Sequence, residues 1–271
     1  MPWTKLKNII LAILAVTNLC LLFLTAGPAL QSRRQAGQAR EEAIRFLQDR
    51  GVQVEESVIP QSMDLAPQTL ERDMEAEART AAALLGGPVT AQARGGGVYR
   101  YENENGSIQF HSDGAVSAQL RPEAFPLEGD RRAGCLAVME RLGCEGTILE
   151  ESGDELLFRQ SWRDSPLFTQ QVTLVCREGG LASIAAGRLL LGVPQEDPGR
   201  SALSVATAVI DFINGISALG DVCNRVDSIE PGYVTTASLS GPTALTPVWR
   251  ITTDTGAYQM DTVTGGVTRV S

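Results

Sequence analysis

The sequence YRYENENGSIQFHSDGAVSAQL, residues 99–120, contains two turn signals between three runs of alternating apolar and polar residues. The runs lie before Asn105-Gly106, between this pair and Asp113-Gly114, and after the second pair. Such alternation is typical of strands with one buried face, and Asn-Gly and Asp-Gly accept the positive φ angles of tight hairpin turns. These residues therefore predict a three-stranded antiparallel meander.

Helical and strand patterns alternate on both sides of this meander. Apolar residues at helical spacing predict helices that begin near Ala36 and stop at Gly51, and that cover 70–85, 135–142 and 201–217. Strand patterns are expected at 52–59, 168–176, 181–186, 221–235, 244–253, 257–263 and 267–270. The chain is thus expected to be α+β, with helix-plus-antiparallel-sheet modules.

The second half of the chain looks like two copies of one unit, a helix followed by an antiparallel sheet, and the first half resembles a variant of it. Polar, proline-bearing stretches at 121–130 and 193–200 are expected to be linkers. The predicted organisation is a tail and anchor at 1–32, then three α+β modules at 33–123, 124–195 and 196–271.

An apolar segment near the start predicts a membrane anchor. Residues 9–26 are almost unbroken apolar sequence, and 8–32 contain no Asp, Glu, Lys or Arg. With its flanks this length reaches the roughly 30 Å of a bilayer core, so a single transmembrane helix is expected. A cleaved signal peptide is the alternative, although the Leu24 and Ala26 pair does not fit the small-x-small cleavage pattern. We expect a short cytoplasmic N-terminus and a large extracellular domain at the cell membrane.

Composition and cysteine usage exclude some functions. The net charge of −9 argues against nucleic acid as a partner and favours a solvated acidic surface. Cys20 lies in the apolar segment. The cysteines outside it are four, an even number that permits disulfides, although a role as small apolar core residues is an equal alternative. There is no CxxC pair and only one histidine, so neither a metal nor a cofactor is expected. The outer cysteines are Cys135, Cys144, Cys176 and Cys223.

Three patterns could carry catalysis, and each has a simpler interpretation. Asp254-Thr255-Gly256-Ala257 matches the local motif of aspartic proteases, but too little chain follows it and a hairpin turn explains it. His111 beside Asp113 could supply a base, but it lies on a predicted strand. The acids at 150–155 are expected in a solvated turn. We therefore expect no catalytic residues and no enzyme activity.

Both ends of the chain resemble the YycI/YycH regulatory proteins. At the start, Trp3-Thr4-Lys5-Leu6-Lys7-Asn8-Ile9 with the later Asn18 is similar to their opening pattern, although Pro2 replaces the usual acid. At the end, residues 247–251, 258–261 and 264–267 resemble their closing hairpin and that of PepSY-type modules. The residues that carry this part are Pro247, Trp249, Tyr258, Asp261 and Gly265. The alanine-rich, cysteine-bearing middle is unlike the family.

The resemblance implies a membrane-anchored regulator without enzymatic activity. Such proteins bind and modulate a membrane sensor histidine kinase that controls cell-wall metabolism, in part through the transmembrane helix, where Trp3, Lys5, Lys7 and Asn18 would contact the partner. A paralogous YycH-like regulator is a further candidate partner. The alternative is an exported PepSY-like module that binds peptide or cell-wall fragments by its edge strands, and a hydrolase that uses His111 comes third.

Overall fold

The computed structural model describes residue 14 and residues 37–127, 129–238 and 241–270. The apolar segment 9–26, apart from Leu14, lies outside these residues. Within the part of the chain that is described, no helix is long and apolar enough to cross a membrane. The fold of this part is α+β with a mixed sheet, which confirms the fold class predicted from the alternating patterns.

The first helix-plus-sheet unit contains the meander. It consists of α2 (Met74–Leu85), β3 (Thr90–Gly95), β4 (Val98–Asn103), β5 (Gly106–Phe110) and β6 (Ala115–Leu120). Neighbouring strands pair antiparallel in chain order, so the three predicted strands are confirmed and β3 adds a fourth. The side chain of Asp73 caps α2 by accepting from the Ala76 N–H, and Gly86 ends the helix at φ +70°.

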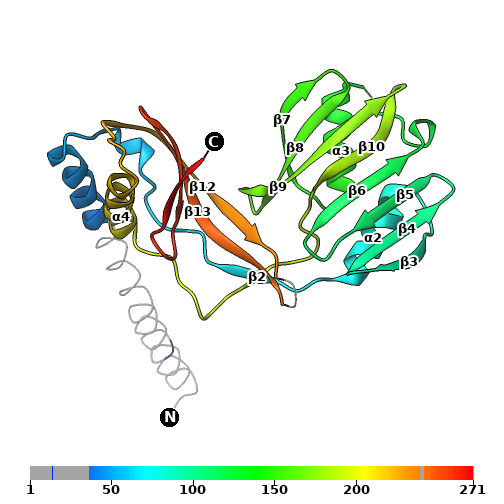
Figure 1. Cartoon of the computed structure of the whole chain (residues 1–271), viewed down its shortest axis with the longest axis horizontal. Coiled ribbons are helices and arrows are strands. Elements are labelled where there is room, and N and C mark those ends of the chain that lie inside the picture. Colours follow the sequence, from blue (N-terminus) through cyan, green and yellow to red (C-terminus); the bar gives the residue numbers. More distant parts are fainter. Residues whose placement is uncertain (1–13, 15–36, 128, 239–240, 271) are drawn as a thin grey trace, which may run out of the picture.

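The second unit repeats this order. It consists of α3 (Arg131–Arg141), β7 (Gly146–Ser152), β8 (Glu155–Trp162), β9 (Ser165–Arg177) and β10 (Gly180–Arg188). Its last strand pairs antiparallel with the last strand of the first unit, with Ser183 opposite Gln119. The two units therefore share one sheet in the order β3-β4-β5-β6-β10-β9-β8-β7. One apolar core packs α2 and α3 against this sheet, and we call the whole body the double-unit lobe (Figure 1).

The third unit forms a separate lobe at the other end of the molecule (Figure 1). It consists of α4 (Val205–Ala218), β12 (Arg225–Thr236), β13 (Thr243–Thr253), β14 (Gly256–Asp261) and β15 (Val267–Val270). A helix over residues 37–49 and the short β1 (Gln53–Val54), which runs parallel to β12, complete it. A second apolar core fills this C-terminal lobe.

The lobes meet at a junction of strands and buried side chains. Strand β2 (Gln68–Leu70) pairs antiparallel with both β13 and β11 (Gln195–Glu196). Strand β12 touches β9 at one parallel bridge, Tyr233 opposite Leu167. A small apolar cluster fills this junction, and its buried members are Leu70, Leu167, Leu190, Tyr233 and Leu245.

Three local predictions were wrong at their boundaries. Leu70 does not belong to a helix, because it pairs with Thr243 in β2 and the helix begins only after the Asp73 cap. The strand expected at 52–59 is limited to β1, which is followed by the 3-10 helix η1 (Glu56–Val58). Both expected linkers contain ordered elements. The one at 121–130 contains the 3-10 helix η2 (Pro122–Ala124), and Pro126 bridges to Gly180, while the one at 193–200 contains β11, which pairs with β2.

Candidate functional site

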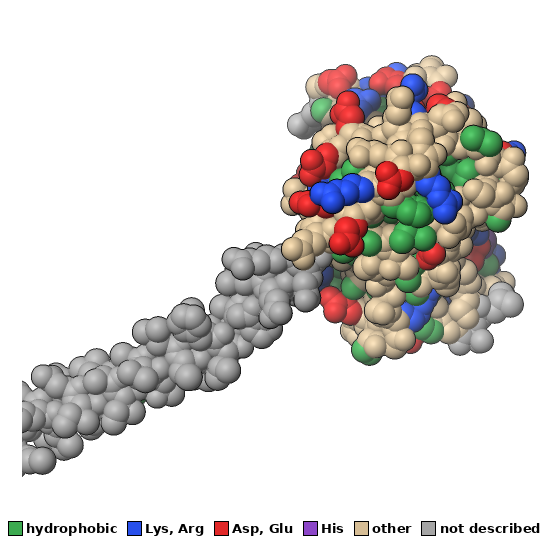
Figure 2. Space-filling model, turned by 90° about the vertical axis from the view of Figure 1, so that its left-hand side faces the viewer, with side chains coloured by type: hydrophobic (Ala, Val, Ile, Leu, Met, Phe, Trp, Pro, Cys, Tyr) green, Lys and Arg blue, Asp and Glu red, His purple; other side chains and the backbone are tan. Residues whose placement is uncertain are grey.

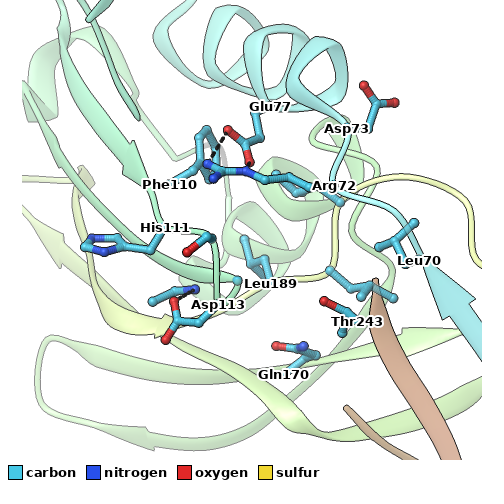
Figure 3. A pocket seen from close by; sticks show the side chains of 15 residues that line it. Leu70, Arg72, Asp73, Glu77, Phe110, His111, Asp113, Gln170, Leu189 and Thr243 are labelled. Carbon is cyan, nitrogen blue, oxygen red and sulfur yellow. Dashed lines mark hydrogen bonds and ion pairs between the residues drawn. The ribbon is translucent and has the colours of Figure 1, made fainter. Parts of the chain in front are cut away.

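A pocket lies at the junction, where side chains from both lobes meet (Figure 3). Its volume is about 50 Å³. Small-molecule sites in proteins usually enclose about 300–1,000 Å³, so this pocket has room only for water-sized groups. The polar and charged residues that line it are Arg72, Asp73, Glu77, His111, Ser112, Asp113, Gln170 and Thr243.

One wall of the pocket is a bidentate ion pair. Arg72, between β2 and α2, places Nε 2.6 Å and Nη2 3.1 Å from the two carboxylate oxygens of Glu77, which is buried on α2. Its Nη1 donates to the Gly97 carbonyl at 2.7 Å, and the guanidinium lies 5.3 Å from the Tyr99 ring centroid. Burial, and then the charge of Glu77, raise the pKa of the neighbouring Tyr101 hydroxyl. The pair thus fixes the start of α2 against the β3–β4 turn.

The only histidine of the chain, His111, also lines the pocket, beside the β5–β6 turn. In Figure 3 the His111 ring points away from the Arg72–Glu77 pair. Asp113 accepts from the Ala115 N–H at 3.1 Å and from Arg188 Nη2 at 3.2 Å, and these partners lower the pKa of its carboxyl, the Ala115 N–H most. No hydrogen bond between described residues joins the His111 ring to Asp113. The geometry therefore favours a role for Asp113 in closing the turn over a role in orienting His111 as a catalytic base.

A buried amide faces the pocket from β9. Gln170 is 2 % exposed, and its Nε2 donates to Thr235 Oγ1 at 2.7 Å. Its Oε1 has no hydrogen-bond partner among the described residues. A bound water would satisfy this carbonyl, and the pocket volume fits that role. The junction pocket is therefore suited to hold solvent that completes the contact between the lobes.

A second polar cluster, which no sequence pattern indicates, also links the lobes. The Arg250 guanidinium on β13 lies 4.1 Å from the Phe168 ring centroid, and that of Arg159 lies 5.5 Å from it. Arg159 also forms a 3.1 Å ion pair with Glu230. Burial, and then the charge of Arg159, lower the pKa of Arg250. A Cβ at Gly232 would lie 2.6 Å from the Phe168 ring, so a glycine permits this close packing.

The structure brings together two of the residues singled out near the C-terminus. Trp249 on β13 and Tyr258 on β14 are buried in the core of the C-terminal lobe, where the Tyr258 ring meets Phe212 edge to face at 6.1 Å. The Tyr258 hydroxyl donates to Asp221 at 2.9 Å. Pro247 lies opposite Tyr233, near the junction. Because the Trp249 and Tyr258 side chains are both buried in this core, we assign them a structural role in packing the sheet.

Asp261 and Gly265, which were also singled out near the C-terminus, shape the β14–β15 turn. Asp261 Oδ1 accepts from the N–H groups of Val263 and Thr264, at 2.7 and 3.0 Å. Gly265 adopts φ +79°, and a Cβ there would lie 2.8 Å from Asp211 on α4. These positions therefore have a structural role in the turn. The partner-contact residues expected in the membrane segment, Trp3, Lys5, Lys7 and Asn18, lie outside the described residues.

Asp254, from the protease-like motif, lies in a turn. Strand β13 ends at Thr253 and β14 begins at Gly256, which confirms the hairpin interpretation. The Asp254 carboxylate accepts from the Asn224 side chain and from the N–H groups of Asn224 and Arg225, and these bonds lower its pKa, the Asn224 side chain most. Within the described chain, no group of three or more His, Cys, Asp or Glu side chains is placed to hold a metal.

Comparisons with known proteins give only distant likenesses. No protein-family model matches the chain, and no curated protein matches it. An uncharacterized protein from Eubacterium rectale ATCC 33656 aligns at a TM-score of 0.41 and 11% identity, over 78% of this chain and 87% of that one. The Bacillus megaterium YpeB C-terminal domain aligns at 0.37 and 10% identity, over 74% of this chain and 99% of that one. These likenesses are too distant to assign a family.

Proposed function

We propose that the chain is a membrane-anchored extracytoplasmic regulator, which binds and modulates a sensor histidine kinase of a two-component system controlling cell-wall metabolism. The apolar segment 9–26 and the resemblance of both ends to YycI/YycH proteins motivate this proposal. The observation that carries it is the threefold repeat of a helix followed by four antiparallel strands. Units joined in this way offer extended surfaces to a protein partner, whereas the junction pocket admits only water-sized groups.

Regulation would follow from a difference in affinity for two kinase states. A partner that binds one signalling state more tightly shifts the equilibrium toward it by that difference in binding free energy. In the membrane, an Asn18 amide bonded across a helix pair would contribute about 0.6 to 2 kcal/mol. Outside it, acidic and basic side chains are interspersed around a small apolar group on the face in Figure 2, a surface suited to a protein partner. A paralogous YycH-like regulator could share the complex.

A two-hybrid assay in bacteria tests the proposal with the intact chain and each sensor histidine kinase of the same genome. We expect association with one kinase and its loss when residues 1–26 are replaced by an unrelated apolar helix. Asn18→Leu should weaken the association several-fold, whereas the matched control Thr17→Val, on the neighbouring helix position, should not. Association with no kinase would refute the proposal, and association unaffected by the replacement would refute the transmembrane contact.

The edge strand β3 favours a second candidate function, a PepSY-like module that binds peptide or cell-wall fragments. Among the strands that the structure describes, β3 is the last of its sheet and pairs with β4 alone, and most of its residues are exposed. An extended peptide could add to such an edge through main-chain hydrogen bonds. Cell-wall peptides that raise the melting temperature of the intact chain in detergent would support this function. No shift at millimolar peptide would contradict it.

A further inference from the structure

Two cysteines from different elements of the second unit lie side by side in the core of the double-unit lobe. Cys135 on α3 and Cys176 on β9 are 0 % and 5 % exposed, and their Sγ atoms are 3.4 Å apart. A disulfide needs a sulfur–sulfur distance of about 2.05 Å, so the two atoms would have to approach by about 1.4 Å more. Small rotations about the two Cα–Cβ bonds can supply a movement of that size.

The remaining described cysteines do not share this arrangement. Cys144 is buried, and its sulfur faces the Leu142 carbonyl at 3.9 Å. Cys223 is partly exposed near the end of α4, and its sulfur lies 3.5 Å from the Arg225 carbonyl. Each has its own local backbone contact, so both serve as internal controls for any chemistry at the pair.

The surface offers access to one of the paired sulfurs. Cys176 lines an open hollow of about 290 Å³ whose charged residues include Arg131 and Asp154. Burial raises the pKa of the Cys176 thiol and raises that of Cys135 to about 12, while the positive charge of Arg131 opposes both shifts. Cys176 is therefore the thiol that an oxidant would reach first, and Cys135 behind it is the resolving thiol.

We propose that Cys135 and Cys176 form a redox-modification site, at which thiol–disulfide exchange creates a bond that ties α3 to β9. The Cys176 thiolate attacks one sulfur of an external disulfide, such as oxidised glutathione, and the other sulfur leaves as a thiolate. The Cys135 thiolate then attacks Cys176 Sγ and displaces the second external thiolate. The protons of the two cysteines pass to the leaving thiolates. The protein loses two electrons, and the external disulfide is reduced to two thiols.

The bond would close a loop that contains the whole β7–β8 hairpin. Cys135 and Cys176 are 41 residues apart, and both hairpin strands lie between them. A cross-link across a loop of this length stabilises the fold mainly by restricting the unfolded chain. Oxidation would thus make the second unit the part most resistant to unfolding. This inference concerns a different property from the proposed regulatory function and does not depend on it.

Tryptic mapping of the intact chain in detergent tests the pairing directly. Trypsin places each outer cysteine in its own peptide: Cys135 in 133–141, Cys144 in 142–159, Cys176 in 164–177 and Cys223 in 201–225. After incubation of the folded chain with oxidised glutathione and alkylation, we expect 133–141 linked to 164–177, lighter by two hydrogen atoms than the separate peptides. Dithiothreitol should release both peptides.

Variants distinguish the site from nonspecific oxidation. Cys135→Ser should abolish the cross-link and leave Cys176 as a glutathione mixed disulfide, whereas Cys144→Ser should leave the cross-link unchanged. The oxidised protein should melt about 5 to 15 °C above the reduced protein, and this difference should vanish in Cys135→Ser. Cross-links that involve Cys144 or Cys223 as often as the pair, or no cross-link in folded wild-type protein, would overturn the proposal. Because the wild-type map suffices for this judgement, a variant that fails to fold does not affect it.

Discussion

At the residue scale, Asp221 joins three segments of the C-terminal lobe. It follows α4, and its carboxylate accepts hydrogen bonds from Tyr258 on β14 at 2.9 Å and from Arg269 Nε on β15 at 2.7 Å. Arg269 also forms a salt bridge with it. The bond from Arg269, and then that from Tyr258, lower the pKa of the Asp221 carboxyl. The ionised carboxylate is therefore the form that the folded chain stabilises.

This lowered pKa predicts a pH dependence of stability. Since the folded value lies below the 3.8 of a free aspartate, the contribution is fully present above that pH and is lost as the pH falls through the folded value. Asp221→Asn should lower the urea midpoint at pH 7 and make the midpoint less dependent on pH below about 4. Urea unfolding of both proteins from neutral pH downward measures this. Asp49→Asn, at an exposed helix position, is the control, and an Asp221→Asn midpoint that falls with pH as steeply as the wild type would contradict the expectation.

Residues near one another in sequence could be grouped from the sequence, and distant ones could not. His111 and Asp113 attracted attention because a turn holds them together, and the structure assigns Asp113 to closing that turn. In contrast, Phe168 and Arg250 meet only because β9 and β13 approach each other at the junction. No local sequence pattern marks such a contact, so the second polar cluster could be identified only from the structure.

At the element scale, the packing of α4 against β15 depends on a glycine. Gly215 lies inside α4, where glycine costs about 0.5 to 1 kcal/mol relative to alanine. A Cβ at this position would lie 2.7 Å from the Cβ of Val267, on the first residue of β15. The close approach of helix and strand explains why a poor helix former is present here.

Gly215→Ala should therefore destabilise the chain despite its better helix propensity. Overpacking typically costs about 1 to 3 kcal/mol, which exceeds the propensity gain, so we expect a net loss of about 1 kcal/mol in the free energy of unfolding. Val267→Ala in the same chain should restore part of that loss, and a double-mutant cycle from urea unfolding measures this coupling. Additive effects of the two changes would show that the contact does not limit packing.

Elements defined by local chemistry were predicted well. The predicted turns lie at the strand boundaries of the meander, because hairpin formation depends on the turn residues themselves. The first turn is at residues 104–105, so Gly106 already begins β5, and residues 111–114 separate β5 from β6. The start of α2 was misplaced because Leu70 continues the apolar spacing of the helix, although it belongs to β2. Its pairing with β13 is a long-range contact, which overrides the local periodicity.

At the scale of the whole molecule, the two lobes have separate cores that the junction connects. Leu245 on β13 is fully buried there, beside Leu167 and Tyr233. Tyr233 donates to the Ala66 carbonyl at 3.0 Å, which holds the segment before β2 in place. The stability of each lobe is therefore coupled to the other mainly through this small cluster and the strand pairs around it.

Leu245→Ala should uncouple the lobes. Removing a buried leucine costs about 2 to 5 kcal/mol, and here the cavity would open at the junction. Hydrogen exchange should then report different opening free energies for the double-unit lobe and the C-terminal lobe. In the wild type we expect the opening free energies of the two lobes to be more similar. Leu156→Ala, equally buried inside the double-unit lobe, is the matched control and should lower protection in that lobe alone. An equal loss in both lobes for both variants would contradict a limiting junction.

The repeated unit was visible in the sequence as an element order, and its assembly was not. Each helix and the strands after it follow local periodicity, so the order of elements in the second half was predicted. The pairing of β6 with β10 joins strands from different units, and neither strand carries a signal for its partner. The position of the junction pocket depends on similar long-range contacts. For this reason, His111 and Asp113 are the only residues lining it that the sequence indicates as candidate functional residues.

The β6–β10 pairing also sets an order of events during synthesis. The first unit leaves the ribosome complete, but one edge of β6 lacks its neighbour until β10 has been made. In this interval the nascent chain exposes a strand edge that can pair with another copy, which is a route to aggregation. Slowing translation between β6 and β10 would lengthen this exposure and lower the yield of correctly folded chain, whereas the same delay after β10 would not.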